Sequence, residues 1–156
     1  SMLTATVAGL FGVVRAPQKV IAASEESDSE WDLSDQEWRT RLSPESYQVL
    51  RREGTEPPFT SALNNEKRTG IYHCAGCDLP LFSSQAKYES GTGWPSFWKP
   101  LSGAIATKVD FKLIVPRTEY HCSRCGGHQG HVFNDGPRPT GKRYCNNGVA
   151  LRFQTA

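Results

Sequence analysis

Alternating apolar and polar positions predict short strands along the last two thirds of the chain. The alternation is clearest in residues 109–115 and in residues 149–153. Two further short runs with strand-forming residues cover 70–74 and 118–122. Turn-forming residues separate the four segments, and short strands joined by turns are typical of a mainly β fold.

Two short helices are predicted ahead of these strands. Ser34 and Glu37 can form a capping box, in which each side chain satisfies a backbone amide at the helix start, and Trp38 begins an apolar face. Ser43, followed by a proline, starts a second helix that stops at Gly54. We expect both helices to pack on a sheet.

The composition indicates one domain and excludes two classes of partner. Among 156 residues, 18 are Lys or Arg and 16 are Asp or Glu, so the net charge of +2 gives no basic surface for nucleic acid. The longest apolar stretch, residues 5–14, is far shorter than the roughly 20 apolar residues of a membrane-spanning helix. We therefore expect no nucleic-acid or membrane partner. We also expect a monomer.

Charge divides the N-terminal part of the chain. Residues 1–24 contain Arg15 and Lys19 but no acid, and an acidic run follows in residues 25–40. This change is typical of the junction between an organelle transit peptide and a mature protein, although a disordered tail is the alternative. Residues 1–30 are thus expected to lie outside the fold. If residues 1–24 are a transit-peptide remnant, we expect a plastid or mitochondrial protein, and otherwise a cytoplasmic one.

The pattern Tyr-His-Cys-x-x-Cys occurs twice and predicts a metal site. Its cysteines are Cys74, Cys77, Cys122 and Cys125. Two Cys-x-x-Cys turns supply the four thiolates of a tetrahedral zinc, which leaves no open coordination position, so one structural zinc per chain is expected to join two hairpins across a sheet. Redox disulfides, structural disulfides and an iron–sulfur site are the alternatives, and the sequence lacks the βαβ context, the signal peptide and the cluster spacings that they require.

The fifth cysteine, Cys145, is the candidate nucleophile. It follows Lys142 and Arg143, whose positive charge favours a thiolate, whereas the plainer interpretation is an inert buried cysteine. His128 and His131 could supply an acid or a base to the same cleft. A glycine-rich turn also carries Trp94 between Gly93 and a proline, where it could form the apolar wall of a small pocket.

From about Trp31 to Phe153 the chain resembles the methionine sulfoxide reductase B family. The motifs that carry the resemblance match in order and spacing, and they are Thr55-Glu56-Pro57-Pro58-Phe59, Tyr72-His73-Cys74 with Cys77, Ser90-Gly91-Thr92-Gly93-Trp94-Pro95-Ser96-Phe97, Gly130-His131-Val132-Phe133-Asn134-Asp135-Gly136-Pro137 and Arg143-Tyr144-Cys145-x-Asn147. The resemblance implies one domain over residues 31–156, with two facing antiparallel sheets in a tent-like arrangement.

The resemblance also implies reduction of the R epimer of methionine sulfoxide in peptides and proteins. Cys145 would become a sulfenic acid and be regenerated by an external thiol, from thioredoxin or from glutaredoxin with glutathione. The roles implied are the methyl pocket for Trp94, proximity to the sulfoxide oxygen for His128 and His131, a place beside the nucleophile for Arg143, a hydrogen bond in the site for Asn147, and support of substrate binding for Phe133.

Two departures from the family pattern and one rival interpretation remain open. Many relatives have a resolving cysteine where this chain has Thr92, and many have serine where it has Gly148. Threonine at position 92 changes how oxidised Cys145 is reduced again. Glycine at position 148 is expected to loosen hydrogen bonding beside Cys145. The rival is a zinc-stapled β module that binds a peptide or protein without catalysis, but it leaves the residues around Cys145 without a use.

Overall fold

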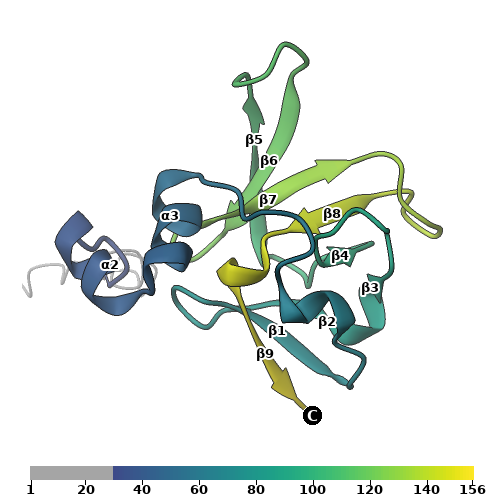
Figure 1. Cartoon of the computed structure of the whole chain (residues 1–156), viewed down its shortest axis with the longest axis horizontal. Helices are drawn as coiled ribbons and strands as arrows, with labels where there is room; N and C mark the ends of the chain where they lie inside the picture. Colours follow the sequence, from purple (N-terminus) through teal and green to yellow (C-terminus); the bar gives the residue numbers. More distant parts are fainter. Residues whose placement is uncertain (1–29) are drawn as a thin grey trace, which may run out of the picture.

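The computed structural model describes residues 30–156, in which two antiparallel sheets form most of the fold (Figure 1). The three-stranded sheet has the order β2 (Pro80–Ser83), β1 (Gly70–Cys74), β9 (Leu151–Thr155). The six-stranded sheet has the order β3 (Lys87–Tyr88), β4 (Ser96–Phe97), β8 (Arg143–Asn146), β7 (His128–Phe133), β6 (Arg117–Cys122), β5 (Ile105–Asp110). The predicted mainly β fold is confirmed. The predicted tail, residues 1–30, falls outside the described residues apart from Glu30.

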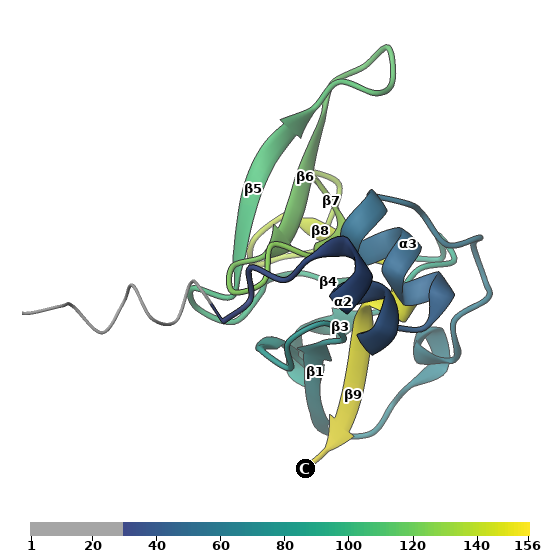
Figure 2. The same cartoon turned by 90° about the vertical axis from the view of Figure 1, so that its left-hand side faces the viewer.

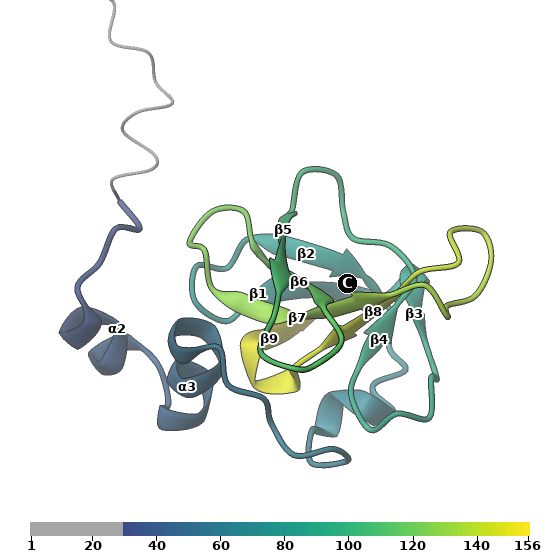
Figure 3. The same ribbon diagram turned by 90° about the horizontal axis from the view of Figure 1, so that it is seen from above.

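Both predicted helices are present. Helix α2 (Asp35–Arg41) has the capping box, because Ser34 Oγ accepts from Glu37 N at 3.2 Å and Ser34 N donates to the Glu37 carboxylate at 2.7 Å. Helix α3 (Pro44–Arg52) contacts β7, and α2 packs against α3. The two helices lie together at one side of the sheets (Figure 3). No helix of the described part is long and apolar enough to cross a membrane.

Aromatic side chains from both sheets form the core. Tyr72 and Phe82 come from the three-stranded sheet, Phe97 and Tyr120 come from the six-stranded sheet, and all four are fully buried. The ring centroids of Phe82 and Phe97 are 4.2 Å apart, and those of Tyr72 and Phe97 are 4.9 Å apart. Phe97 therefore joins the sheets, and its replacement by alanine would cost roughly 3–5 kcal/mol of stability.

The predicted strand over residues 109–115 is wrong. Strand β5 ends at Asp110, which pairs with Arg117, and residues 111–116 form the loop of the β5–β6 hairpin. Val109 and the apolar side chains of this loop are exposed, so their alternation does not mark a face turned to the core. Figure 2 shows this hairpin projecting from the rest of the molecule.

The predicted strand over residues 149–153 begins two residues later than expected. Residues Gly148–Ala150 form a short 3-10 helix, η3, and β9 follows from Leu151. The Glu56 carboxylate accepts hydrogen bonds from Gly148 N and Val149 N, which turns this segment away from the sheet. Two further 3-10 helices, η1 (Ala62–Asn65) and η2 (Ser84–Ala86), lie in the connections.

Candidate functional site

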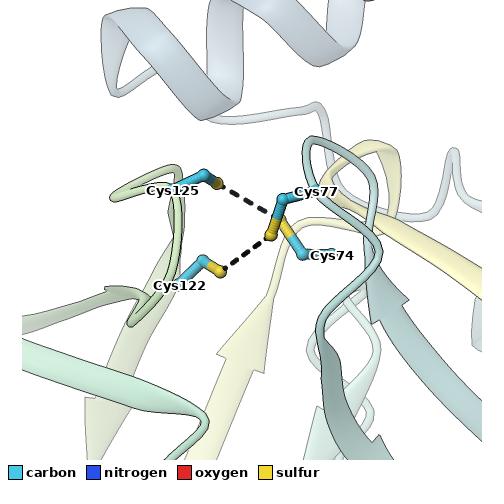
Figure 4. Close-up of side chains that lie close together, drawn as sticks. All are labelled: Cys74, Cys77, Cys122 and Cys125. Carbon is cyan, nitrogen blue, oxygen red and sulfur yellow. Dashed lines mark hydrogen bonds between the residues drawn. The ribbon is translucent and has the colours of Figure 1, made fainter. Parts of the chain in front are cut away.

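The four predicted metal ligands are brought together between the sheets. Their Sγ atoms all lie within 4.8 Å of one another, with 3.7 Å between Cys74 and Cys125 and 3.5 Å between Cys77 and Cys122 (Figure 4). A tetrahedral zinc with Zn–S bonds of ~2.3 Å spaces its ligands by about 3.8 Å, whereas a disulfide needs about 2.05 Å. The cluster fits a single zinc ion, and all four thiols are free.

The surroundings of this cluster favour thiolates. Gly76 N donates to Cys74 Sγ and Gly127 N donates to Cys125 Sγ, each at 3.4 Å, and Gln129 Nε2 donates to Cys74 Sγ at 3.4 Å. Such donors stabilise sulfur ligands in their charged form. The prediction of two hairpins across one sheet needs correction, because the β1–β2 hairpin and the β6–β7 hairpin belong to different sheets. A zinc ion here would join the two sheets.

Cys145 lies on β8 between its two neighbouring strands. It pairs with His131 of β7 on one side and with Ser96 of β4 on the other. Side chains of directly paired residues point to the same face of a sheet, as do residues two apart on one strand. Register and alternation therefore place Arg143 and Phe133 on the same face as Cys145.

A cavity of ≈ 270 Å³ opens on this face. Six of the seven predicted catalytic and substrate residues line it, namely Cys145, His131, Arg143, Asn147, Trp94 and Phe133. Gly130 also lines it, and a Cβ there would lie 1.8 Å from the Cys145 carbonyl oxygen, so glycine is needed for the close approach of β7 to β8. Thr55, Thr92 and Arg117 complete the wall.

Burial disfavours the thiolate form of Cys145. Burial raises its pKa above the ordinary value, and this outweighs the opposing effects of the Arg143 guanidinium and the Thr92 hydroxyl. The sequence predicted that Lys142 and Arg143 would favour the thiolate. Arg143 does so in part, but Lys142 is exposed and donates to Asn134 Oδ1.

Arg143 is held in place by an acid and an aromatic ring. Its Nε and Nη2 donate to the Asp135 carboxylate at 2.9 and 3.0 Å, and its guanidinium carbon lies 4.3 Å from the centroid of the Phe133 ring. A bidentate pair of this kind fixes the guanidinium plane as well as its position. Asp135 and Phe133 thus support the cation beside Cys145.

His131 is paired with a carboxylate. Its Nε2 lies 2.7 Å from Asp110 Oδ2, and Arg117 Nη2 lies 3.3 Å from the same oxygen. The Lys112 amide, with the His131 imidazole, holds the pKa of Asp110 at about 2, so Asp110 is ionised and the His131 nitrogen donates. Burial lowers the pKa of His131 below its ordinary value, and Asp110 offsets this only in part.

His128 lies behind the site. It lines a separate cavity of ≈ 370 Å³ with Glu119 and Asp110, and its ring centroid is 5.5 Å from that of His131. Its Nδ1 is 2.9 Å from Glu119 Oε1, whose second oxygen is 3.0 Å from His121 Nδ1. Burial acts to raise the pKa of Glu119, but hydrogen bonds from the two histidines leave it lowered.

Trp94 and Asn147 are tied to the segment before η1. Trp94 Nε1 donates to the Glu56 carbonyl oxygen at 3.0 Å. Asn147 Oδ1 accepts from Glu56 N, and Asn147 Nδ2 donates to the Gln129 carbonyl oxygen, each at 2.9 Å. Asn147 therefore links β7 to the segment that holds Trp94.

Gly148 joins this network through its backbone. Its amide donates to the Glu56 carboxylate, and an added Cβ would lie 1.9 Å from Ser61 Oγ. The space that a larger residue would occupy is thus filled by Ser61. The expected loosening of hydrogen bonding beside Cys145 stays a prediction.

Four polar residues of the site were missed from the sequence: Glu56, Asp110, Arg117 and Glu119. Glu56 bonds to residues more than 90 positions away, and Asp110 reaches His131 only through the strand register. Partial signals existed for two of the four, because Glu56 lies in a motif quoted above and Glu119 lies in a predicted strand two residues before a histidine. Nothing local distinguished Asp110 or Arg117.

Comparison with known proteins places the chain in a family. Residues 42–155 match the SelR domain. A peptide methionine sulfoxide reductase MsrB of Leptospira interrogans is 53% identical over 126 residues, which cover 80% of this chain and 96% of that protein. One from Thioalkalivibrio sulfidiphilus is 51% identical over 134 residues, covering 85% and 98%.

A third relative is longer than this chain. Peptide methionine sulfoxide reductase B1, chloroplastic, of Arabidopsis thaliana is 52% identical over 122 residues, which cover 78% of this chain but 60% of that protein. Among solved structures, a Mis18 "Yippee-like" domain aligns with a TM-score of 0.45 and 16% identity over 57% of this chain and 98% of its own, too distant to bear on function. The SelR match and the identities above 50% show that the chain belongs to the SelR domain family, together with the MsrB peptide methionine sulfoxide reductases.

Proposed function

We propose that the protein reduces methionine sulfoxide in peptides and proteins, with selectivity for the R epimer. The observation that carries the proposal is the cavity in which Cys145, His131 and Trp94 meet. The cavity offers a nucleophile, a proton carrier and an apolar wall, which are the groups that a sulfoxide needs. The names of the relatives support the same reaction.

Substrate orientation would come from Trp94 and from the polar side of the cavity. The indole is held by its bond to the Glu56 carbonyl, so its ring can receive the terminal methyl group of the substrate. The sulfoxide oxygen would then face His131. Because methyl, oxygen and lone pair occupy different corners of the sulfur, fixing two of them selects one epimer.

His131 is the better candidate for proton transfer, because it pairs with Cys145 while His128 lines another cavity. Burial favours a protonated thiol at Cys145 and a neutral imidazole at His131. His131 Nε2 donates to Asp110, which leaves Nδ1 to accept the Cys145 proton and pass it to the sulfoxide oxygen. His128, held by Glu119, would pack behind His131 as a positioning residue.

The chemical step balances without another reactant. The Cys145 sulfur attacks the sulfoxide sulfur and forms an S–S bond, while the sulfoxide oxygen takes the Cys145 proton from His131. The S–S and S–O bonds then break as the hydroxyl group moves to the Cys145 sulfur, which gives the sulfenic acid and releases methionine. Two external thiols then reduce the sulfenic acid, giving a disulfide and water. Thioredoxin, or glutathione with glutaredoxin, would be the partner, because the other four of the five cysteines form the metal cluster.

Zinc would act on the fold and not on the substrate. Cys74, Cys77, Cys122 and Cys125 would hold it, and four thiolates leave it no open position, so the chemistry that it supplies is neutralisation of sulfur charge between the sheets. Gln129 connects the metal cluster to the Cys145 cavity. Its side chain donates to Cys74 Sγ, and its main-chain carbonyl oxygen accepts from the Asn147 side chain. A plastid location stays a prediction that the chloroplastic relative supports, with a mitochondrial or a cytoplasmic location as the alternatives.

The test uses two peptides that differ only in the epimer of one methionine sulfoxide. With dithiothreitol, the protein should remove the oxygen from the R peptide, and mass spectrometry measures the loss. Cys145→Ser should abolish turnover with zinc content unchanged, and Trp94→Ala should weaken discrimination between the epimers. Equal turnover of both epimers would contradict the pocket, and no turnover would favour a non-catalytic zinc-stapled module.

A further inference from the structure

Exposed apolar side chains gather at the loop of the β5–β6 hairpin. We define the apolar tip as Val109, Phe111, Leu113, Ile114 and Val115. These residues are 57% to 103% exposed, and within residues 30–156 Phe59 is the only other large hydrophobic residue in the exposed class. Exposed apolar clusters on a folded domain mark interaction sites.

The base of the tip forms part of the proposed active site. Asp110 and Arg117 are the last paired residues of the hairpin; Asp110 bonds to His131, and Arg117 lines the Cys145 cavity. The six residues between them continue outward from the cavity wall. A ligand that extends from the cavity along β6 therefore meets the tip.

Phe59 lies on the other side of the cavity. Its amide donates to the Gly93 carbonyl oxygen at 2.7 Å, beside Trp94, which precedes β4. In the sheet, β4 and β6 flank β8 and β7, so exposed apolar residues are found on both sides of Cys145. Strands β4 and β6 themselves are about 14 Å apart, the width of three strand spacings of ~4.8 Å.

We propose that the apolar tip is a docking surface for a polypeptide substrate, and that it binds apolar side chains flanking the methionine sulfoxide. This inference rests on the proposed function. The strand register places Glu119 of β6 level with Cys145, about 10 Å across the sheet, and Val115 lies four residues before Glu119, about 13 Å along the strand direction. The tip is thus roughly 16 Å from Cys145, and it should contact residues four or five positions from the sulfoxide. Polypeptide segments exposed by unfolding carry such side chains.

The charges near the tip favour a polypeptide over a lipid surface. Lys108 and Lys112 both donate to the Glu53 carboxylate of the α3 C-terminus, and Arg117 pairs with Asp110. These three cations face two carboxylates, so one positive charge remains near the tip. Surfaces that recognise anionic headgroups carry clusters of about four or more basic residues.

The test compares two peptides of eleven residues with a central methionine sulfoxide. One has leucine four and five positions away on both sides, and the other has serine there. The variant Leu113→Ser/Ile114→Ser/Val115→Ser removes the apolar surface, and Leu113→Ile/Ile114→Leu/Val115→Ile is the matched control that keeps it. The ratio of kcat/KM for the leucine peptide to that for the serine peptide should fall about tenfold in the serine variant and persist in the control.

Each outcome separates this inference from the proposed function. Turnover with an unchanged ratio in the serine variant, or no preference in the wild-type protein, would overturn the docking surface alone. No turnover of either peptide or of free methionine sulfoxide would refute both. Two controls identify the other possible occupants of the tip when the ratio is unchanged. If phosphatidylglycerol vesicles bind the wild-type protein but not the serine variant, the tip is a membrane-binding surface. If only the wild-type protein dimerises in sedimentation velocity, the tip binds a second copy of the chain.

Discussion

Asp110 and His131 are hydrogen-bonded across an intervening strand. Asp110 ends β5 and His131 lies in β7, with β6 between them, yet Asp110 Oδ2 and His131 Nε2 are 2.7 Å apart. The contact couples the projecting hairpin to the residue that pairs with Cys145. The position of the hairpin therefore sets the orientation of the imidazole.

Replacement of Asp110 should change both the rate and its pH dependence. Asp110→Asn removes the carboxylate that raises the His131 pKa against the lowering effect of burial. In our account neutral His131 is the active form, so the acidic limb of kcat/KM lies below the ordinary histidine range and should move lower still. We also expect kcat/KM to fall about tenfold, because the His131 imidazole loses the carboxylate that orients it.

The pH profile and an NMR titration of His131 measure the two effects. Asp78→Asn is the matched control, since Asp78 is exposed and pairs with Arg152 away from the cavity. It should leave both unchanged. An acidic limb that moved to higher pH in Asp110→Asn would contradict the assigned role.

Glu53 should make the free energy of unfolding depend on pH in the acidic range. Hydrogen bonds from Lys108 and Lys112 lower the Glu53 pKa to about 2. Its folded pKa is below the unfolded value of about 4.3, so its stabilisation is complete above that value and is lost as pH falls toward 2. Because a third of the Glu53 side chain is exposed, screening limits the contribution to about 0.5–1 kcal/mol.

Urea unfolding between pH 7 and pH 3 measures this contribution. Glu53→Gln should be less stable than the wild-type protein at pH 7, and the difference should shrink as pH falls. Glu30→Gln is the control, because Glu30 is exposed, lies before helix α2 and makes no ion pair within the described residues, so the substitution should not reproduce this trend. A difference that grew toward acid would reverse the predicted sign.

Loss of one metal ligand should destabilise the whole fold. The cluster connects a hairpin of each sheet, so Cys122→Ser removes a link between them and should cost at least 3 kcal/mol with loss of bound zinc. Cys145→Ser makes the same chemical change outside the cluster and should keep one zinc per chain. Metal analysis and thermal unfolding compare the two. An unaltered Tm in Cys122→Ser would count against a structural metal.

The sequence predicted the parts whose signals are local. The capping box at Ser34 and the proline start of α3 act within one helical turn, so both helices appear where expected. The paired Cys-x-x-Cys motifs also carry their geometry in their spacing. Strands β3 and β4 are only two residues long, so no alternation could reveal them.

The sequence failed where a distant contact decides the conformation. Alternation in residues 109–115 suggested a strand, but pairing ends at Asp110–Arg117 and the apolar residues face solvent. Residues 148–150 form a 3-10 helix whose first amide donates to the Glu56 carboxylate, and Glu56 lies 92 residues earlier in the chain. The partners of His128 and His131 depend on register in the same way, and the sequence could not distinguish the two histidines.

Thr92 occupies a place from which a cysteine could reach Cys145. Both residues line the same cavity, and the Thr92 hydroxyl acts to lower the pKa of the Cys145 thiol. Thr92→Cys should therefore form an intrachain disulfide with Cys145 after one turnover and raise the rate with thioredoxin. Thr92→Ser is the control and should form none. Mass mapping of the oxidised protein detects the bond, and its absence would separate the loop from the nucleophile.

A single turnover without reductant tests the central claim most directly. The wild-type protein, mixed with excess R-sulfoxide peptide and dimedone, should release close to one methionine peptide per chain and carry one dimedone adduct, at Cys145. It should contain no intrachain disulfide, because every other cysteine belongs to the metal cluster. Release of no methionine peptide, or a disulfide between Cys145 and a cysteine of the cluster, would contradict the account.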